Sequence, residues 1–325
     1  MVTRRQTLQG LAASVFIGCS ALPRLSCATG ETGFTAAIAA LEQRHGGRLG
    51  VAALNTASGR RISHRGDARF LLCSTVKFPA AALILSRVDA GSESLDRRVD
   101  YSAADLVTYS PETRQHVASG MALAAICRAG LTQSDNTAAN LMLESFGGPA
   151  ALTAFARSLG DEVTRSDRYE TALNDYTADA AQDTTTPCAM LHLMQRIFVD
   201  NVLSEASRTQ LITWMRANQT GDHRLRDGLP EAWYIGDKTG SGGDNTANDI
   251  AIAWPVADRP VLITAYYAGS NATHAQRDAV LAGVGGAVSR WVLQSAAAWC
   301  DLSVDCSSEP LSLKLMGAEI QKPKE

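Results

Sequence analysis

Lysine is nearly absent from this 325-residue chain: only five of its 30 basic residues are lysines, and three of those lie after residue 313. The remaining two are Lys77 and Lys238. A guanidinium stays charged in proteins, whereas the amine of a lysine can lose its proton when its surroundings lower its pKa. Compositional drift is one explanation of the scarcity. The other is that Lys77 and Lys238 stand where an amine is chemically required.

The chain also lacks an excess of positive charge and the usual metal-binding spacings. Its formal net charge of −3 argues against a nucleic-acid-binding protein, which normally carries a basic excess. It contains no CxxC pair, and its six histidines form no HxH or HxxxH pair, so we expect no zinc site. We expect no other metal and no cofactor. A composition of 46% hydrophobic and 19% charged residues is typical of a globular protein with one large domain or two intertwined ones.

The first 28 residues are predicted to be an export signal. Arg4–Arg5 precedes a short apolar run, Leu11–Ile17, and small residues provide a cleavage site after Ala28. The paired arginines indicate the twin-arginine (Tat) type, so we expect a periplasmic protein. The run is too short for a permanent membrane helix, which needs about 20 residues. Lipidation at Cys19 is the alternative, and the only route by which we expect the chain to meet a membrane. Cleavage after Ala28 would remove three arginines and no acid.

Five cysteines lie beyond this leader. Cys300 and Cys306 are the only close pair, and they could form a disulfide in an oxidising compartment. The other three, Cys73, Cys127 and Cys188, are expected to be small buried hydrophobic residues.

Hydrophobic periodicity predicts a helix, strands, a long helical middle, more strands and a last helix. Apolar residues at helical spacing mark the two terminal helices, at Phe34, Ile38 and Leu41 and at Leu281, Val284, Val288, Trp291 and Val292. Strands are expected at 49–54, 233–238, 250–254 and 261–267, and helices at 121–128, 138–144, 149–159, 190–198 and 211–215. This order predicts an α+β fold: an α/β domain from 29–68 and 217–299, an inserted helical domain at 69–216, and a tail at 300–325.

The first chemical motif is Ser74-Thr75-Val76-Lys77. Its spacing places a hydroxyl and an amine on one helix face. A serine hydroxyl is a poor nucleophile unless a neighbouring base accepts its proton, and a partly buried lysine can do so. Taken alone, the motif could equally be a chance surface pair.

Two further motifs follow along the chain. Ser134-Asp135-Asn136 precedes a predicted helix, and alone it could be a plain N-cap, because all three residue types favour that position. Lys238-Thr239-Gly240 is predicted to end an apolar strand and to run into glycine-rich chain, which alone indicates a strand end with a flexible turn.

Together, S-x-x-K, S-D-N and K-T-G in this order resemble the penicillin-recognising serine enzymes. A fourth segment, Arg168 to Asn174, matches the R-x-E-x-x-L-N pattern of class A β-lactamases and lies in the corresponding place between S-D-N and K-T-G. The resemblance covers roughly residues 34–298. It implies the β-lactamase/D,D-peptidase-like fold, in which an antiparallel sheet is flanked by the N- and C-terminal helices and carries an inserted all-helical domain.

The resemblance also implies a mechanism. Ser74 would attack the lactam carbonyl, with Lys77, Glu170 acting through a water, or both accepting its proton. Ser134 would relay a proton to the lactam nitrogen, and Lys238 would supply positive potential nearby. Glu170 would then activate water to release the product.

The remaining family positions are assigned to substrate binding and support. The resemblance gives substrate-binding roles to Tyr109, Asn136, Asn174, Thr239, Gly240, Ser241 and Arg224. The backbone N–H groups of Ser74 and Ser241 would hold the oxyanion. Arg168 and Asp183 are expected to form the salt bridge that closes the family's Ω-loop.

Two departures from the family pattern limit the expected spectrum. Class A carbapenemases typically join the cysteine before the nucleophile to one after K-T-G, but the expected partner of Cys73 is Gly242. Another common disulfide would join Cys127 to position 81, which is Ala81. We therefore expect neither disulfide, and a monomeric hydrolase of penicillins and cephalosporins that is not a specialised carbapenemase.

Two other functions share part of this pattern. A D,D-peptidase acting on cell-wall peptides has the three motifs but lacks the Glu170–Asn174 pair. A non-hydrolytic penicillin-binding receptor would be acylated at Ser74 without turnover. Both remain alternatives on sequence grounds.

Overall fold

The computed structural model of the chain describes residues 26–176 and 181–300. Most of the predicted leader, the lipidation site at Cys19, the tail from residue 301 and therefore the Cys300–Cys306 disulfide lie outside them. Within the described ranges, no helix combines the length and apolarity that a membrane span requires.

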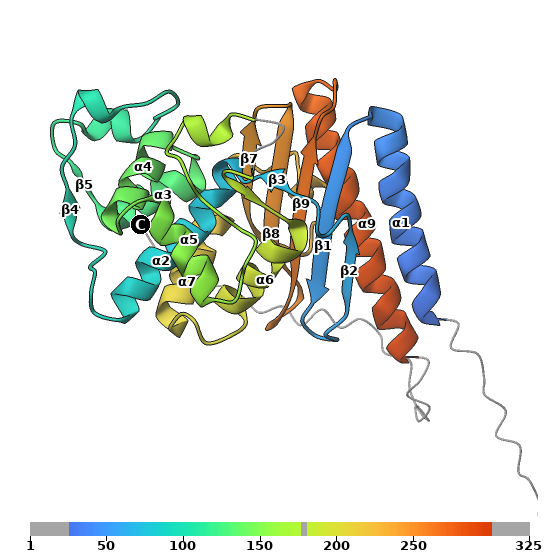
Figure 1. The fold of residues 1–325 in the computed structure, drawn as a ribbon. Helices are drawn as coiled ribbons and strands as arrows, with labels where there is room; N and C mark the ends of the chain where they lie inside the picture. Colours follow the sequence, from blue (N-terminus) through green and yellow to red (C-terminus); the bar gives the residue numbers. More distant parts are fainter. Residues whose placement is uncertain (1–25, 177–180, 301–325) are drawn as a thin grey trace, which may run out of the picture.

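A five-stranded antiparallel sheet in the order β2-β1-β9-β8-β7 forms the centre of the molecule (Figure 1). Its strands are β1 (Arg48–Asn55), β2 (Arg61–His64), β7 (Tyr234–Gly242), β8 (Thr246–Val256) and β9 (Arg259–Ala268). β1 pairs with β9, so that Arg48 lies opposite Ala268 and Asn55 opposite Val261. The sheet joins the two ends of the chain, which confirms the predicted α+β fold class.

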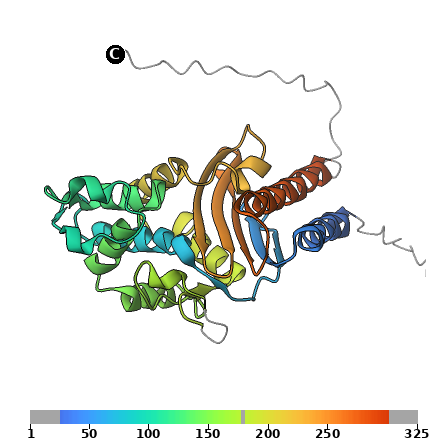
Figure 2. The ribbon, with the colours of Figure 1, turned by 90° about the horizontal axis from the view of Figure 1, so that it is seen from above.

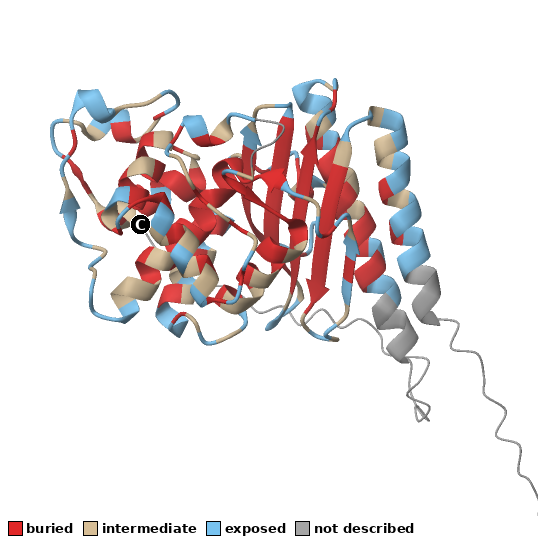
Figure 3. Cartoon of the chain, viewed as in Figure 1, coloured by how far each residue is buried: buried red, intermediate tan, exposed pale blue. Residues whose placement is uncertain are grey.

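Both faces of this sheet are covered. Alternate residues of β1 pack into two different hydrophobic clusters: Val51 and Ala53 face one, while Ala52 and Leu54 face the other. Because successive side chains point to opposite faces, a strand buried on both sides reads as a continuous apolar run. This explains why the strands stand out in the sequence as unbroken hydrophobic segments (Figure 3).

The terminal helices cover one face. α1 (Ser26–His45) and α9 (His274–Cys300) lie side by side there, on the opposite side of the sheet from the other long helices (Figure 2). The predicted apolar positions of both are confirmed as packing positions: Phe34 and Ile38 are buried, as are the five named residues of α9, and Leu41 packs against the same cluster. α1 ends where Gly46 adopts a φ of 68°, a conformation that glycine reaches without a Cβ clash.

Helices from the middle of the chain cover the other face. They are α2 (Lys77–Asp89), α3 (Leu123–Thr132), α4 (Asn136–Ser145), α5 (Pro149–Ser158), α6 (Pro187–Phe198) and α7 (Glu205–Arg216). The short α8 (Leu225–Gly228) instead packs on α9, on the side of the terminal helices. Minor elements are β3 (Phe70–Leu71), β4 (Arg98–Val99), β5 (Met121–Ala122), β6 (Thr184–Thr185) and the 3₁₀ helices η1 (Cys73–Val76), η2 (Ala103–Asp105), η3 (Thr113–His116) and η4 (Ala172–Asn174). The domain boundaries at 69 and 216 stay a prediction.

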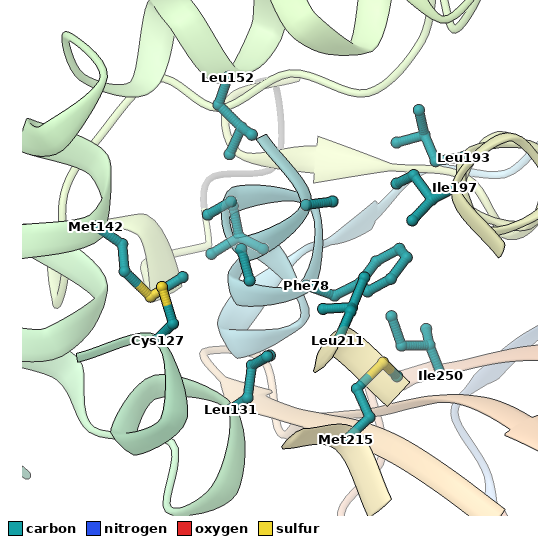
Figure 4. Packing of buried hydrophobic residues seen from close by; sticks show 14 of the residues in the cluster. Phe78, Cys127, Leu131, Met142, Leu152, Leu193, Ile197, Leu211, Met215 and Ile250 are labelled. Carbon is teal, nitrogen blue, oxygen red and sulfur yellow. The ribbon is translucent and has the colours of Figure 1, made fainter. Parts of the chain in front are cut away.

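Phe78 anchors the start of α2 in this helical layer. It is fully buried beside Leu211 and Ile197 and stacks on Phe198 with ring centroids 5.2 Å apart (Figure 4). Interiors of this kind are close-packed, so a large buried ring holds the adjoining backbone in place. The neighbouring Lys77 is thereby fixed in position.

Two predicted boundaries were wrong. The helix expected at 121–128 begins at Leu123, because Met121–Ala122 pairs instead with Arg98–Val99 as β5 with β4. The strand expected to end at Lys238 continues to Gly242, which lies opposite Thr246 of β8. Ladder hydrogen bonds to β8 outweigh the weak strand propensity of the glycines. The K-T-G motif therefore lies within a strand.

Candidate active site

Ser74 and Lys77 lie at the junction of η1 and α2. Their side chains meet as predicted, and Lys77 Nζ donates to Ser74 Oγ at 2.8 Å. Ser74 is 9% exposed and Lys77 is fully buried. A buried amine bonded to a serine hydroxyl can activate that hydroxyl as a nucleophile.

The Lys77 amine connects the separate motifs. Besides Ser74, it contacts Ser134 O at 2.9 Å, Ser134 Oγ at 3.3 Å and Asn136 Oδ1 at 2.8 Å. Glu170 Oε1 lies 3.0 Å away, with neither charged group exposed to solvent. An ammonium has three N–H donors, so these oxygens compete for them. The arrangement places one proton-exchanging amine among a nucleophile, a second hydroxyl and a carboxylate.

The S-D-N segment combines a helix cap with two side chains that face the site. Asp135 is the N-cap of α4 and accepts from Ala138 N at 2.8 Å, as the plain N-cap interpretation requires. Ser134 adopts a φ of 59°, a left-handed conformation that is costly for a residue with a Cβ. The turn directs the hydroxyl of Ser134 and the amide of Asn136 to Lys77. The S-D-N segment therefore both caps α4, through Asp135, and contributes Ser134 and Asn136 to the site.

Lys238 approaches the same hydroxyl from β7. Its amine donates to Ser134 Oγ at 3.1 Å and to Thr239 O at 2.9 Å. Burial, and secondly the nearby charge of Lys77, lower the pKa of Lys238 to about 7. The amine of Lys238 is thus poised to change its charge near neutral pH.

Gly240 lets β7 pass close to the nucleophile. A Cβ at Gly240 would come within 3.1 Å of Leu72 O and Cys73 Cβ and 3.2 Å of Ser74 N. Contacts this short would make β7 or η1 shift by a few tenths of an ångström. The glycine of K-T-G therefore permits the close approach of backbone to backbone.

Glu170 is held by three amide contacts. Asn140 clamps its backbone, accepting from Glu170 N at 2.8 Å and donating to Glu170 O at 3.0 Å. Asn174 Nδ2 donates to Glu170 Oε2 at 2.6 Å, and Ser74 Oγ lies 3.5 Å from Glu170 Oε1. Asn174 Oδ1 is buried without a partner among the described residues, so it can accept from a water placed beside the carboxylate.

The predicted Arg168–Asp183 salt bridge is confirmed. Arg168 Nε donates to Asp183 Oδ2 at 2.6 Å, and Asp183 Oδ1 accepts from the backbone N–H groups of Asp167 and Arg168. The carboxylate of Asp183 is almost fully buried. It joins the two ends of the segment that carries Glu170.

We expect Asp183→Ala to lower stability by about 3 kcal/mol, because it leaves three donors without an acceptor in a buried place. The measurement is the Tm, which should fall by roughly 6–12 °C. Asp183→Asn keeps an acceptor and should lose less. Equal Tm values for the wild type and Asp183→Ala would contradict this support role.

The residues predicted to bind the substrate carboxylate lie close together, beyond Lys238. Thr239 Oγ1 bonds to Thr220 Oγ1, and Ser241 Oγ accepts from Arg224 at 2.8 Å. Arg224 is buried, and its other hydrogen bonds go to Gly240 O, Asn248 O and Asp278 Oδ1. Four of its five N–H groups are thus engaged by the protein, so Arg224 orients Ser241 and adds positive charge.

Tyr109 stands at the mouth of the site. It is 56% exposed with a φ of 64°. Its carbonyl accepts from Asn136 N at 3.0 Å, and Thr108 O accepts from Asn136 Nδ2 at 2.9 Å. The loop that carries the ring is therefore tied to the S-D-N motif.

Asn140, Thr220 and Asp278 contribute to the site but were not predicted. Asn140 lies one helical turn after Asn136, so i,i+4 spacing from a motif residue could have indicated it. No local signal indicates Thr220 or Asp278, which meet their partners only through the tertiary fold.

Cys73, Cys127 and Cys188 are free thiols, so the structure contains neither of the two family disulfides. A Cβ at Gly242 would lie 2.6 Å from Cys73 Sγ, so the two positions are adjacent and only the second cysteine is missing. Within residues 26–176 and 181–300, no group of His, Cys, Asp or Glu side chains is arranged to hold a metal ion.

Comparisons with known proteins agree with this geometry. Residues 33–292 match a family model described as the Beta-lactamase enzyme family. Beta-lactamase L2 of Stenotrophomonas maltophilia is 47% identical over 88% of this chain and 97% of its own, and Beta-lactamase OXY-2 of Klebsiella oxytoca is 46% identical over 74% and 83%. Among solved structures, an ancestral class A β-lactamase and the putative class A β-lactamase PenP from Rhodopseudomonas palustris each give a TM-score of 0.77 at 55% identity. The ancestral enzyme's match covers 78% of this chain and 98% of that protein.

Proposed function

The chain belongs to the class A β-lactamase family and hydrolyses β-lactams, and we propose that it does so through an acyl-enzyme on Ser74. The observation that carries the proposal is the contact of Lys77 Nζ with both Ser74 Oγ, at 2.8 Å, and Glu170 Oε1, at 3.0 Å. Lys77 is within direct proton-transfer distance of the nucleophile, and Glu170 Oε1 is 3.5 Å from Ser74 Oγ, within reach through one water.

In the first half-reaction, Ser74 Oγ forms a bond to the lactam carbonyl carbon and loses its proton. A neutral Lys77 accepts the proton directly, or a water carries it to Glu170. The oxyanion is held by the backbone N–H groups of Ser74 and Ser241. Both proton routes are available to Ser74, because Lys77 Nζ and Glu170 Oε1 lie 3.0 Å apart beside its hydroxyl.

Ring opening then requires a proton at the lactam nitrogen. Ser134 is the proposed donor, since its hydroxyl contacts both Lys77 and Lys238 and can be reprotonated from either amine. The C–N bond breaks as the nitrogen receives this proton. Lys238, Thr239 and Ser241 bind the substrate carboxylate, and Asn136 binds its side-chain amide.

Hydrolysis of the acyl-enzyme is assigned to Glu170 and Asn174. The carboxylate removes a proton from a water that Asn174 Oδ1 helps to orient, and the water oxygen attacks the ester carbonyl. Ser74 leaves as the hydroxyl, and the opened β-lactam departs as an acid. A D,D-peptidase of this family would lack the Glu170–Asn174 pair.

Nitrocefin turnover by the purified chain tests the function. Steady hydrolysis over many equivalents supports the β-lactamase, whereas one stoichiometric burst would identify a penicillin-binding receptor or a D,D-peptidase. We propose penicillins and cephalosporins as substrates, because position 242 lacks the cysteine that would pair with Cys73. Rapid turnover of imipenem would overturn the proposed spectrum.

The low pKa of Lys238 predicts a pH limit on substrate capture. The amine is charged below about pH 7 and loses its charge above it, so kcat/KM for an anionic β-lactam should fall as pH rises through this value. The Lys238→Arg variant keeps a positive charge at this position over the whole pH range, so its kcat/KM should not fall as pH rises through about 7. The same fall of kcat/KM in the variant and the wild type would show that another group causes it.

We further propose export to the periplasm by the twin-arginine route and action as a monomer. The support is the sequence of the leader, in which Arg4–Arg5 precedes the apolar run. Replacing both arginines by lysine should leave an uncleaved precursor in the cytoplasm, detected by its mass in cell fractions. Release of mature enzyme by this variant would contradict the twin-arginine route. A mass that shows a lipid on Cys19 would contradict the predicted cleavage after Ala28.

A further inference from the structure

A groove separate from the active site runs along the end of the sheet that carries the β8–β9 turn. Two hollows of about 580 and 390 Å³ share Ile212, Trp254 and Asp258, and we call them together the basal groove. α7 borders it on one side and the β8–β9 hairpin on the other. Tyr234, which lines it, lies four residues before Lys238 on β7, so roughly 13 Å of strand separates the groove from the catalytic amine.

The basal groove exposes apolar side chains. Tyr234 is 62% exposed, Val256 64% and Val199 41%, and all three line the groove. Trp254, partly buried, lies between them on β8, next to the irregular pairing between Ala253 and Val256. Contiguous exposed apolar surface of this kind marks an interaction site more often than isolated exposed residues do.

Three arginines rim the groove. Arg208, Arg216 and Arg259 line it, and within the described part of the chain none of them forms an ion pair; the only acid among the lining residues is Asp258. Arg216 lies over the ring of Tyr234, 5.2 Å from its centroid. The apolar side chains of the groove could pack against aliphatic residues of a bound segment, and its three arginines could pair with acidic residues. An extended segment that carries both types of side chain therefore fits the basal groove.

We propose that the basal groove binds the chain's own segment 301–325. This segment follows α9. That helix runs antiparallel to β9, from the end of the strand at Ala268 back toward the end at Arg259. Arg60, just after the β1–β2 turn, lies over Trp291 of α9, and Thr56 and Ala57 of that turn line the groove. The helix therefore runs toward the end of the sheet that carries the β8–β9 turn, on the face opposite the groove, so the segment that follows it reaches the groove by passing around that end (Figure 1).

The segment is long enough and has the required composition. Twenty-five residues can span up to about 80 Å. Its first ten residues contain Asp301, Asp305 and Glu309 and no basic residue, which complements the arginine rim. Leucines then alternate with polar residues at Leu311, Leu313 and Leu315, so an extended backbone would direct all three to one side.

Docking there would connect the two layers of the fold. The groove is bordered by α7 of the helical layer and by β8 and β9 of the sheet, so a bound segment contacts both. The family model matches residues 33–292, so the segment lies outside the matched part of the chain. The active site on the upper part of β7 stays open, and nitrocefin turnover is expected to be unaffected.

Photo-crosslinking of the full chain tests the proposal. Val256 is replaced by the photoreactive residue p-benzoylphenylalanine, and the same residue at Tyr176, 48% exposed near the active site, gives the background. After irradiation, mass spectrometry should identify peptides from 301–325 joined to position 256 within one chain. Absence of these peptides above the Tyr176 background would overturn the proposal, as would crosslinks only to a second copy.

A matched pair of variants separates specific docking from proximity. Replacing Leu311, Leu313 and Leu315 by serine should lower the crosslink yield about tenfold and reduce the Tm, because the apolar contacts are removed. Replacing Ser303, Ser307 and Ser312 by alanine should leave both unchanged. Equal yields in the two variants would overturn the proposal. Nitrocefin turnover, measured alongside, reports on the proposed function independently of either result.

Discussion

Replacing Ser74 by alanine should lower kcat for nitrocefin by about 10⁴-fold or more, because no other group can form the ester. The nucleophile is specified by its contacts, since Ser74 Oγ is the hydroxyl that lies within hydrogen-bond distance of both Lys77 Nζ and Glu170 Oε1. Oxyanion donors and binding groups stay in place in the variant. The remaining rate should therefore come from those groups alone.

The variant should fold normally. Ser74 is nearly buried, and alanine removes one oxygen from a place where Lys77 keeps its contacts to Ser134 and Asn136. Ser86→Ala, on the same helix but away from the site, is the matched control and should keep full activity. An unchanged Tm with no acyl-enzyme by mass spectrometry is expected for Ser74→Ala. Turnover close to wild type would show that another residue is acylated.

The fold class was predictable because the strands are buried on both faces. Val51 and Ala52 pack into different clusters, yet both are apolar, so the strand appears as an unbroken run bounded by turns. The error at the end of β7 has a different origin. Gly240 and Gly242 have low strand propensity, which predicts a turn, but pairing with β8 keeps them in the strand. Tertiary hydrogen bonds, which no local pattern reveals, decided the boundary.

The candidate site was predictable to the extent that it consists of motif residues. Ser74 and Lys77 are three residues apart, so helical geometry brings them together. The contact of Lys77 with Glu170 spans 93 positions, and family resemblance alone indicated it. Thr220 and Asp278 belong to no motif, and their roles follow only from tertiary contacts, of Thr220 with Thr239 on β7 and of Asp278 on α9 with Arg224.

The scarcity of lysine has a physical counterpart in the structure. Lys77 and Lys238 both donate to Ser134 Oγ, at 3.3 and 3.1 Å, so two buried amines face one hydroxyl. Two like charges in such a place disfavour each other, and this repulsion adds to burial in lowering the pKa of Lys238. Arginine at either position would keep both charges fixed. An amine that can give up its proton is what the proposed proton relay requires.

Replacing Glu170 by glutamine should convert the enzyme from a catalyst into a trap for its substrate. Glutamine preserves the shape and keeps one acceptor oxygen for Lys77 Nζ, but its amide nitrogen cannot accept from Asn174 Nδ2, and the side chain cannot remove a proton from water. Deacylation should slow by about 10³-fold, as expected for loss of a general base. Mass spectrometry should then show the chain heavier by one intact substrate. Glu144→Gln, on the exposed side of α4, is the control and should turn over normally.

The burst phase of the Glu170→Gln variant also distinguishes the two proton routes. If Lys77 accepts the proton of Ser74 directly, acylation should stay fast and only the steady state should collapse. If the water held by Glu170 accepts it, the burst itself should slow, although acyl-enzyme still accumulates. The 2.8 Å contact of Lys77 with Ser74, against 3.5 Å for Glu170, favours the fast burst. Steady turnover at the wild-type rate would refute Glu170 as the base, because the Asn174-held water would then need no carboxylate.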